Sequence, residues 1–200
     1  MEAGTVKTKE IFRKVWRMIR WPIAVIVILI VALVAYRYPT VKSEMKTAEA
    51  VAAIHAQRLT LSDVDGSNLP PTPDPMLVDA TIEGVDANDN GIRDDVELAI
   101  YKKYPNNQKV RAAELQYAMN LQSQLTTVWN SDTLVAAIQN EERAYFCIQD
   151  TGAFKSVRPQ ADRLEAMMLN TESRKAKYKQ IYQDYMTSYG SLDSVQNCDV

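Results

Sequence analysis

The chain has 200 residues, a hydrophobic fraction of 46% and a formal net charge of −2, values that suit one folded domain with an appended segment. The charge is divided unevenly, because residues 1–36 carry six Lys and Arg against two Glu, whereas residues 37–200 carry 17 against 23. The larger part is acidic and has no basic cluster, which excludes nucleic-acid binding as an expected function.

The first predicted element is a membrane-directed helix. Residues 21–36, WPIAVIVILIVALVAY, contain no charged side chain. As a helix this run would cover about 24 Å, a little less than the hydrocarbon core of a bilayer, with Trp21 and Tyr36 at the two interfaces. We therefore predict a basic cytoplasmic tail over residues 1–20 and one transmembrane helix, a signal anchor, over residues 21–36. The cations before the helix outnumber those just after it, which places the N-terminus in the cytoplasm.

A cleaved signal peptide has the same order of charged and apolar regions. Leu33-Val34-Ala35 is followed by Tyr-Arg-Tyr-Pro, so the run has no clear Ala-x-Ala cleavage site, and this favours an uncleaved anchor. Both hypotheses export the rest of the chain. The predicted location is the bacterial inner membrane, crossed once, with the C-terminal domain in the periplasm.

Two connecting segments are predicted next. Residues 37–61 form a juxtamembrane helix in this prediction, because residues 41–60 lack Gly and Pro and are rich in good helix formers. Residues 62–75, SDVDGSNLPPTPDP, contain four prolines and predict an extended spacer without regular structure. The residues that follow, 76–85, have the pattern of a short strand.

The remaining domain, residues 76–200, is predicted to be mainly helical. One helix is expected from Arg93 to Tyr104 and ends before Pro105, and the next runs over residues 107–128. A third begins with Ser131 as its N-cap and ends near residue 150, a fourth covers about residues 159–169, and a fifth runs from the cap Thr171 to Gly190. The second helix has one apolar face, formed by Val110, Tyr117, Leu121, Leu125 and Val128. The expected fold class is therefore mainly α, a transmembrane helix followed by an exported helical bundle.

The bundle begins with an acidic loop, residues 86–97, with the sequence DANDNGIRDDVE. It matches the calcium-loop pattern D-x-[DN]-x-[DN]-G-x5-E at every specified position. Calcium takes six to eight oxygen ligands, so alternate residues of a tight loop can supply them, and glycine permits the sharp turn. The predicted calcium ligands are Asp86, Asn88, Asn90, the backbone carbonyl of Ile92, Asp94 and Glu97. The alternative is a solvated acidic turn.

The loop and its exit helix, residues 86–104, resemble an EF-hand loop, and more closely the loops of thrombospondin type 3 repeats and of many exported bacterial proteins. The apolar residue stands at position seven, Ile92, with Arg93 at position eight, and the entering segment contains Gly84 and is not helical. The sequence NGIRDDVE is also similar to loops of bacterial membrane-anchored proteins. The resemblance implies an exported site, and a single loop favours a permanently bound structural calcium over a sensor.

Three further features bear on function. Cys147 and Cys198 are the only cysteines and predict a disulfide in an oxidising compartment, the alternative being two unrelated buried thiols. Tyr178, Tyr182, Tyr185 and Tyr189 recur at helical spacing, as the packed face of the last helix or as a surface for a protein partner. The adjacent Glu141 and Glu142 predict a solvated helix face.

No nucleophile with a histidine partner, zinc motif or phosphate-binding loop is present in the sequence. We expect a membrane-anchored, calcium-binding, non-catalytic binding or scaffold protein of the cell envelope. One alternative is a calcium-dependent sensor or adhesion module, and another is a periplasmic hydrolase that uses carboxylates.

Overall fold

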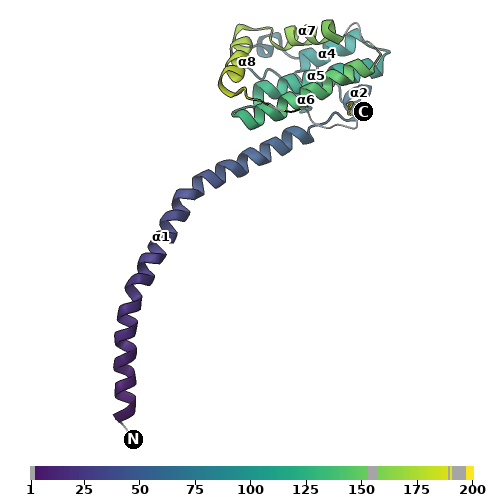
Figure 1. The fold of residues 1–200 in the computed structure, drawn as a ribbon. Helices are drawn as coiled ribbons and strands as arrows, with labels where there is room; N and C mark the ends of the chain where they lie inside the picture. Colours follow the sequence, from purple (N-terminus) through teal and green to yellow (C-terminus); the bar gives the residue numbers. More distant parts are fainter. Residues whose placement is uncertain (1–2, 153–156, 189, 191–196) are drawn as a thin grey trace. The chain divides into compact units, whose positions relative to one another are not determined.

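The computed structural model describes residues 3–152, 157–188, 190 and 197–200, and its contacts divide the chain into two units, residues 1–46 and 47–200. Within the described residues every regular element is an α-helix, so the mainly α part of the prediction is confirmed, without a strand over residues 76–85 (Figure 1). The helices are α1 (Ala3–Ala56), α2 (Leu61–Asp65), α3 (Pro75–Val78), α4 (Asp94–Lys103), α5 (Gln108–Thr127), α6 (Ser131–Asp150), α7 (Val157–Met168) and α8 (Glu172–Tyr185).

Helix α1 makes up the described part of the first unit and continues into the second. It contains the apolar run 21–36, and it is long and apolar enough to cross a membrane. Its most apolar window has a mean hydropathy of 2.6, and none of that window is buried inside the protein. The predicted transmembrane and juxtamembrane helices are thus one element, which keeps Pro22 and Pro39 within it and ends at Ala56, before the predicted residue 61.

The second unit is built around α5. Figure 1 shows this helix in the middle of the unit, where α2, α4, α6, α7 and α8 contact it. Every residue from Arg111 to Leu125 is buried. The sequence predicted one buried apolar face, but all sides of the helix are buried between residues 111 and 125, and its polar side chains are enclosed as well.

The buried polar side chains of α5 bind the surrounding segments. The Arg111 guanidinium donates to the carbonyl oxygen of Val64, and Gln122 donates to the carbonyl of Glu83. Buried polar groups require such partners, since an unpaired one costs about 1–3 kcal/mol. The helix thus fixes chain segments that have little regular structure of their own.

Apolar side chains form two buried clusters. The larger one joins α4, α5, α6 and α7 and includes Ile92, Val96, Ile100, Leu115, Met119 and Leu164. The smaller one lies where α6 and α8 meet the end of α1, and includes Ile54, Leu134, Ile138 and Ile181. Residues of α1 after Lys46 thus belong to the second unit.

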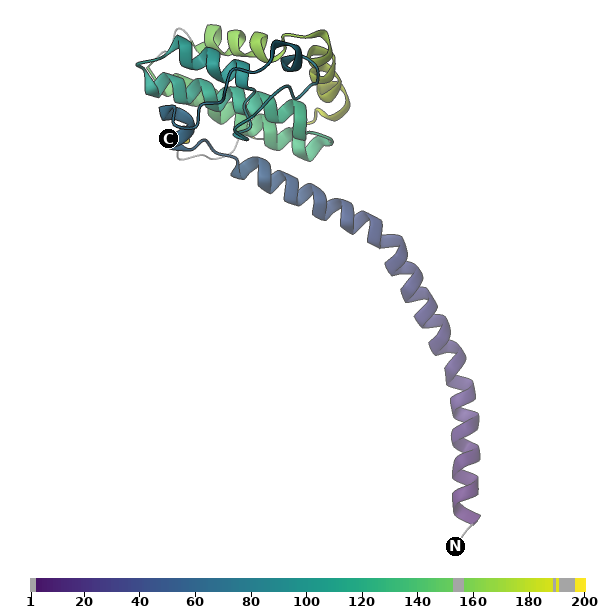
Figure 2. The same cartoon turned by 180° about the vertical axis from the view of Figure 1, so that it is seen from behind.

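Residues 62–75, predicted to be an extended spacer, are part of the folded unit. Helix α2 lies within this stretch, and Val64 is 1% exposed in the larger cluster. Asp63 accepts hydrogen bonds from the backbone and the hydroxyl of Thr60, which caps the helix, and Gly66 ends it with φ +97°. The prediction failed because the four prolines occupy only residues 70–75. The residues before them carry the signals of a short helix, with Thr60 as the N-cap and Gly66 as the C-cap. Figure 2 shows the chain between α2 and α4 crossing one face of the unit.

Other predicted elements shift at their ends. The strand expected over residues 76–85 is replaced by the short helix α3, whose N-cap Asp74 accepts from the amide of Met76. Helix α6 is capped by Asn130, one residue before the predicted Ser131, because the Asn130 side chain accepts from the Thr133 amide. The predicted cap Thr171 is confirmed, but α8 ends at Tyr185 and not at Gly190.

Candidate functional site

The acidic loop turns sharply around its first carboxylate. The two oxygens of Asp86 accept hydrogen bonds from the backbone amides of Asn90, at 3.1 Å, and Gly91, at 2.8 Å. Asp89 has φ +54° and Gly91 has φ +80°, both in the left-handed region. This backbone folds residues 86–91 around one carboxylate, as the calcium-loop pattern predicts.

Gly91 is also the place where the loop meets the end of α1. A Cβ atom at this position would lie 2.4 Å from Nε2 of Gln57, and the positive φ would strain any other residue. Asn88 makes a second contact between the loop and this part of the chain, since its Nδ2 donates to the carbonyl oxygen of Asn68 at 2.6 Å. The loop therefore contacts residues 57–68, which the sequence had placed outside the domain.

The last two predicted ligands lie at the start of α4. Asp94 and Glu97 are both 0% exposed, and Asp94 Oδ1 accepts from the amide of Ala87 across the loop. Asp94 and Glu97 stand in the first turn of the helix, where negative charge complements the helix dipole. The side chain of Ile92 is fully buried in the larger cluster, which leaves its backbone for the loop.

Arg93, at position eight, holds the loop to the rest of the bundle. Its guanidinium donates to the carbonyls of Met167, at 2.8 Å, and Met168, at the end of α7, and pairs with Asp95. Gly84 makes room for it, since a Cβ there would lie 2.4 Å from Arg93 Cδ. The departure from an apolar residue at position eight thus has a structural reason, a charged cap on the end of another helix.

The segment that enters the loop is held by Arg174 of α8, a residue that the sequence analysis did not single out. Its guanidinium is 0% exposed. It donates to the Val78, Thr81 and Ile82 carbonyls and to the side chains of Asp79 and Asn170. Apart from Asn170, these partners lie more than ninety residues earlier in the chain, and no sequence motif marks an arginine of this kind.

Burial in the loop disfavours the charged form of its carboxylates. Burial raises the pKa of Glu97 to about 7, partly offset by the Asn88 amide and reinforced by the negative charge of Asp94. Burial is also the main cause that raises the pKa values of Asp86 and Asp94. None of these three carboxylates forms an ion pair within the part of the chain that the structure describes.

Two oxygen atoms of the predicted ligand set are buried and have no hydrogen-bond partner, Asn88 Oδ1 and Asp94 Oδ2. Buried acceptors without donors are unusual in proteins and fit a site for a cation. Among the described residues no group of three or more His, Cys, Asp or Glu side chains is arranged to hold a metal ion. Asp86, Asp94 and Glu97 therefore do not form such a group by themselves, and the predicted set adds two asparagine side chains and the Ile92 carbonyl to them.

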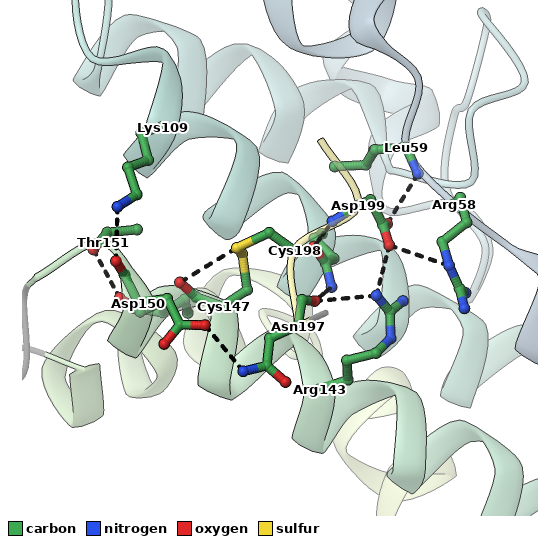
Figure 3. Close-up of a disulfide and its surroundings, with 12 residues drawn as sticks. Arg58, Leu59, Lys109, Arg143, Cys147, Asp150, Thr151, Asn197, Cys198 and Asp199 are labelled. Atoms are coloured by element: carbon green, nitrogen blue, oxygen red, sulfur yellow. Dashed lines mark hydrogen bonds and ion pairs between the residues drawn. A yellow bond between two sulfur atoms is a disulfide. The ribbon is translucent and has the colours of Figure 1, made fainter. Parts of the chain in front are cut away.

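The two cysteines, fifty-one residues apart, are bonded to each other. Figure 3 shows that the residues next to Cys198 are bound as well. The carboxylate of Asp199 is fully buried and accepts from the Leu59 amide and from Arg143, and it pairs with Arg58. The end of the chain is thus attached both to α6 and to the residues that follow α1.

The tyrosines that were predicted to form one stripe are partly packed against the bundle. Tyr182 and Tyr185 pack against the smaller apolar cluster, and the rings of Tyr178 and Tyr182 lie 4.8 Å apart. Tyr189 lies outside the described residues. The prediction of a solvated face for Glu141 is wrong, because its carboxylate accepts from Tyr117 and from Gln124 between α5 and α6.

Comparison with known proteins identifies no relative: no protein-family model matches the chain, and neither a curated protein nor a solved structure is similar to it. The functional argument therefore depends on the geometry of the chain itself.

Proposed function

We propose that the chain is a membrane-anchored, calcium-binding, non-catalytic scaffold or binding protein of the cell envelope. In this proposal calcium is structural, α1 anchors the chain with its N-terminus in the cytoplasm, and the second unit lies in the periplasm. Protein partners contact the α8 surface that includes Tyr178, Tyr182 and Tyr185.

The observation that carries the calcium proposal is the pair of unpartnered buried oxygens in a motif-matched loop. Asn88 Oδ1 and Asp94 Oδ2 lack donors, and the pKa of the nearby Glu97 is raised by burial. A divalent cation would satisfy both oxygens and would offset the like charges. The loop contacts Gln57, Asn68 and, through Arg93, the end of α7, so such an ion would stabilise several segments at once.

The anchor proposal is supported by the exposure of the apolar run. Leu29 and Leu33 are 63% and 65% exposed, and none of the surrounding window is buried. Exposed leucines in water lose about 1.5–3 kcal/mol each compared with burial, so such a run favours a lipid environment.

Chelation should destabilise the protein, because the free energy of unfolding rises with the logarithm of the free calcium concentration above its Kd. For the full chain in an uncharged detergent, calcium at 100 times its Kd should add about 2.7 kcal/mol to the free energy of unfolding. Thermal or denaturant unfolding with calcium and with a chelator measures this difference. Asp86→Ala should remove the difference, whereas Asp89→Asn, in the same loop but exposed, should retain it.

Glu97→Gln separates loss of calcium from loss of the fold. Because burial disfavours the charged form of Glu97, the amide should stabilise the protein in chelator, yet it should remove the response to calcium. Equal stability of the unmodified chain with and without calcium would contradict the site. A calcium-induced change in helix packing far from the loop would instead support the sensor hypothesis.

Membrane anchoring should survive extraction at alkaline pH. We expect the intact mass to include residues 1–36 and the chain to stay with the membrane, whereas a cleaved signal would remove those residues. Leu29→Arg should weaken insertion, because an arginine at the centre of a span costs about 2.5–3.5 kcal/mol, while Leu29→Ile should not. Protease added outside the cytoplasmic membrane should digest the second unit only in the proposed orientation.

A further inference from the structure

A groove lies between α6 and the end of α8, away from the acidic loop. It has a volume of about 390 Å³, within the range of small-molecule sites. Its lining residues come from α6 and from the end of α8. The residues that matter for its chemistry are Glu141, Glu142, Tyr145, Phe146, Tyr182 and Met186.

The carboxylate of Glu141 is the polar centre of this groove. One oxygen accepts from the Tyr117 hydroxyl at 3.0 Å, and the other accepts from Nε2 of Gln124. Both donors are neutral, and within the described residues no Lys or Arg pairs with Glu141. Each carboxylate oxygen can accept a second hydrogen bond, so the group keeps capacity for a ligand.

The surroundings of Glu141 carry negative charge. Glu142 lines the same groove. Burial raises the pKa of Glu141, and the negative charge of Glu165 on α7 adds to this shift. Its two hydrogen-bond donors oppose this shift. A bound cation would favour the charged form of Glu141, whereas an anion or a neutral molecule would not.

The walls of the groove are aromatic. Phe146 is 41% exposed, and its ring meets that of Tyr145 edge to face, with the ring centres 6.3 Å apart. Tyr182 lies across from them on α8. Aromatic faces attract organic cations by their quadrupole, whereas a hydrated metal ion needs more oxygen ligands than this groove offers.

We propose that this groove binds a small organic ammonium ion, with the ammonium group on Glu141 and the carbon skeleton against Tyr145, Phe146 and Tyr182. The proposal is independent of the calcium loop, because no residue is shared between the two sites. The class of ligand follows from the combination of a carboxylate without a cationic partner and aromatic walls.

Binding of benzylammonium to the full chain in an uncharged detergent tests this proposal, with benzyl alcohol as the neutral probe of the same shape. Ligand-observed NMR titration gives both dissociation constants. Benzylammonium should bind about tenfold more tightly, the contribution of a charge-assisted hydrogen bond. Glu141→Gln should remove this preference, and Phe146→Ala should weaken benzylammonium about threefold, as expected for a partly exposed cation–π contact.

Glu172→Gln is the matched control, because Glu172 is exposed at the start of α8 and outside the groove. Equal affinity for the two probes, or equal effects of Glu141→Gln and Glu172→Gln, overturns the proposal. If circular dichroism shows that Glu141→Gln does not fold, Glu142→Gln and Phe146→Ala decide: weaker benzylammonium binding in both supports the site, and unchanged binding in either refutes it.

Discussion

Replacing both cysteines with alanine should lower the free energy of unfolding by about 4 kcal/mol, because the bond closes a loop of 51 residues in the unfolded chain. Cys147 is fully buried, so the alanine variant also loses some packing in the larger cluster. Denaturant unfolding of the double variant, Cys147→Ala with Cys198→Ala, measures the loss. Reductant should lower the stability of the unmodified chain by a similar amount.

The control for this experiment is the double variant itself under reductant, which should show no further change. Asp199→Asn separates the covalent bond from its neighbours, because it weakens the pairing with Arg58 and Arg143 and keeps the disulfide. The free energy of unfolding of that variant should be lower by about 1–3 kcal/mol, since the two arginines then face a neutral amide. An unchanged melting temperature on reduction, with the sulfurs shown by mass to be free, would contradict a stabilising disulfide.

Replacing Arg174 with methionine should lower the free energy of unfolding by about 3–5 kcal/mol. The guanidinium is 0% exposed and donates to three backbone carbonyls, those of Val78, Thr81 and Ile82. Methionine fills most of the volume but donates nothing. The segment that enters the acidic loop would then lose its attachment to α8.

Lys175→Met is the matched control for Arg174, because it changes the next residue of the same helix, which is 55% exposed and pairs with the exposed Glu172. It should change stability by less than about 1 kcal/mol. Arg174→Lys should fall between the two, since lysine keeps the charge but cannot present five donors in a planar fork. Equal stability of Arg174→Met and Lys175→Met would show that the arginine contributes little.

Local signals in the sequence predicted much of the fold. Thr171 caps α8 as predicted, through the amide of Arg174, and α6 ends at Asp150, also as predicted. These predictions succeeded because a cap and the amide it binds lie within three residues of each other. The cap of α6 was placed one residue late, since Asn130 and Ser131 are both good caps and only geometry selects between them.

Contacts between distant residues were not predictable in this way. Val64 lies in a stretch with loop composition, yet it is buried because α2 packs on α5. Glu141 and Glu142 are identical neighbours, but only Glu141 was found to bind Tyr117 and Gln124 of α5. The acidic loop matches the calcium-loop pattern because its predicted ligands lie within twelve residues, while its contacts to Gln57, Asn68 and Met167 are distant and left no pattern in the sequence.

The attachment of the C-terminus beside the end of α1 has a mechanical consequence. Asn140 of α6 donates to the carbonyl of Ile54, and Nε2 of His55 lies 3.3 Å from Oε1 of Gln139. Asp199 binds the amide of Leu59 and is held to the same helix by Arg143 and by the disulfide of Cys198 (Figure 3). Tension applied along the end of α1 would therefore pass to α6 through several hydrogen bonds that act in parallel, and the disulfide would keep the C-terminal residues on α6 while they carry part of that load.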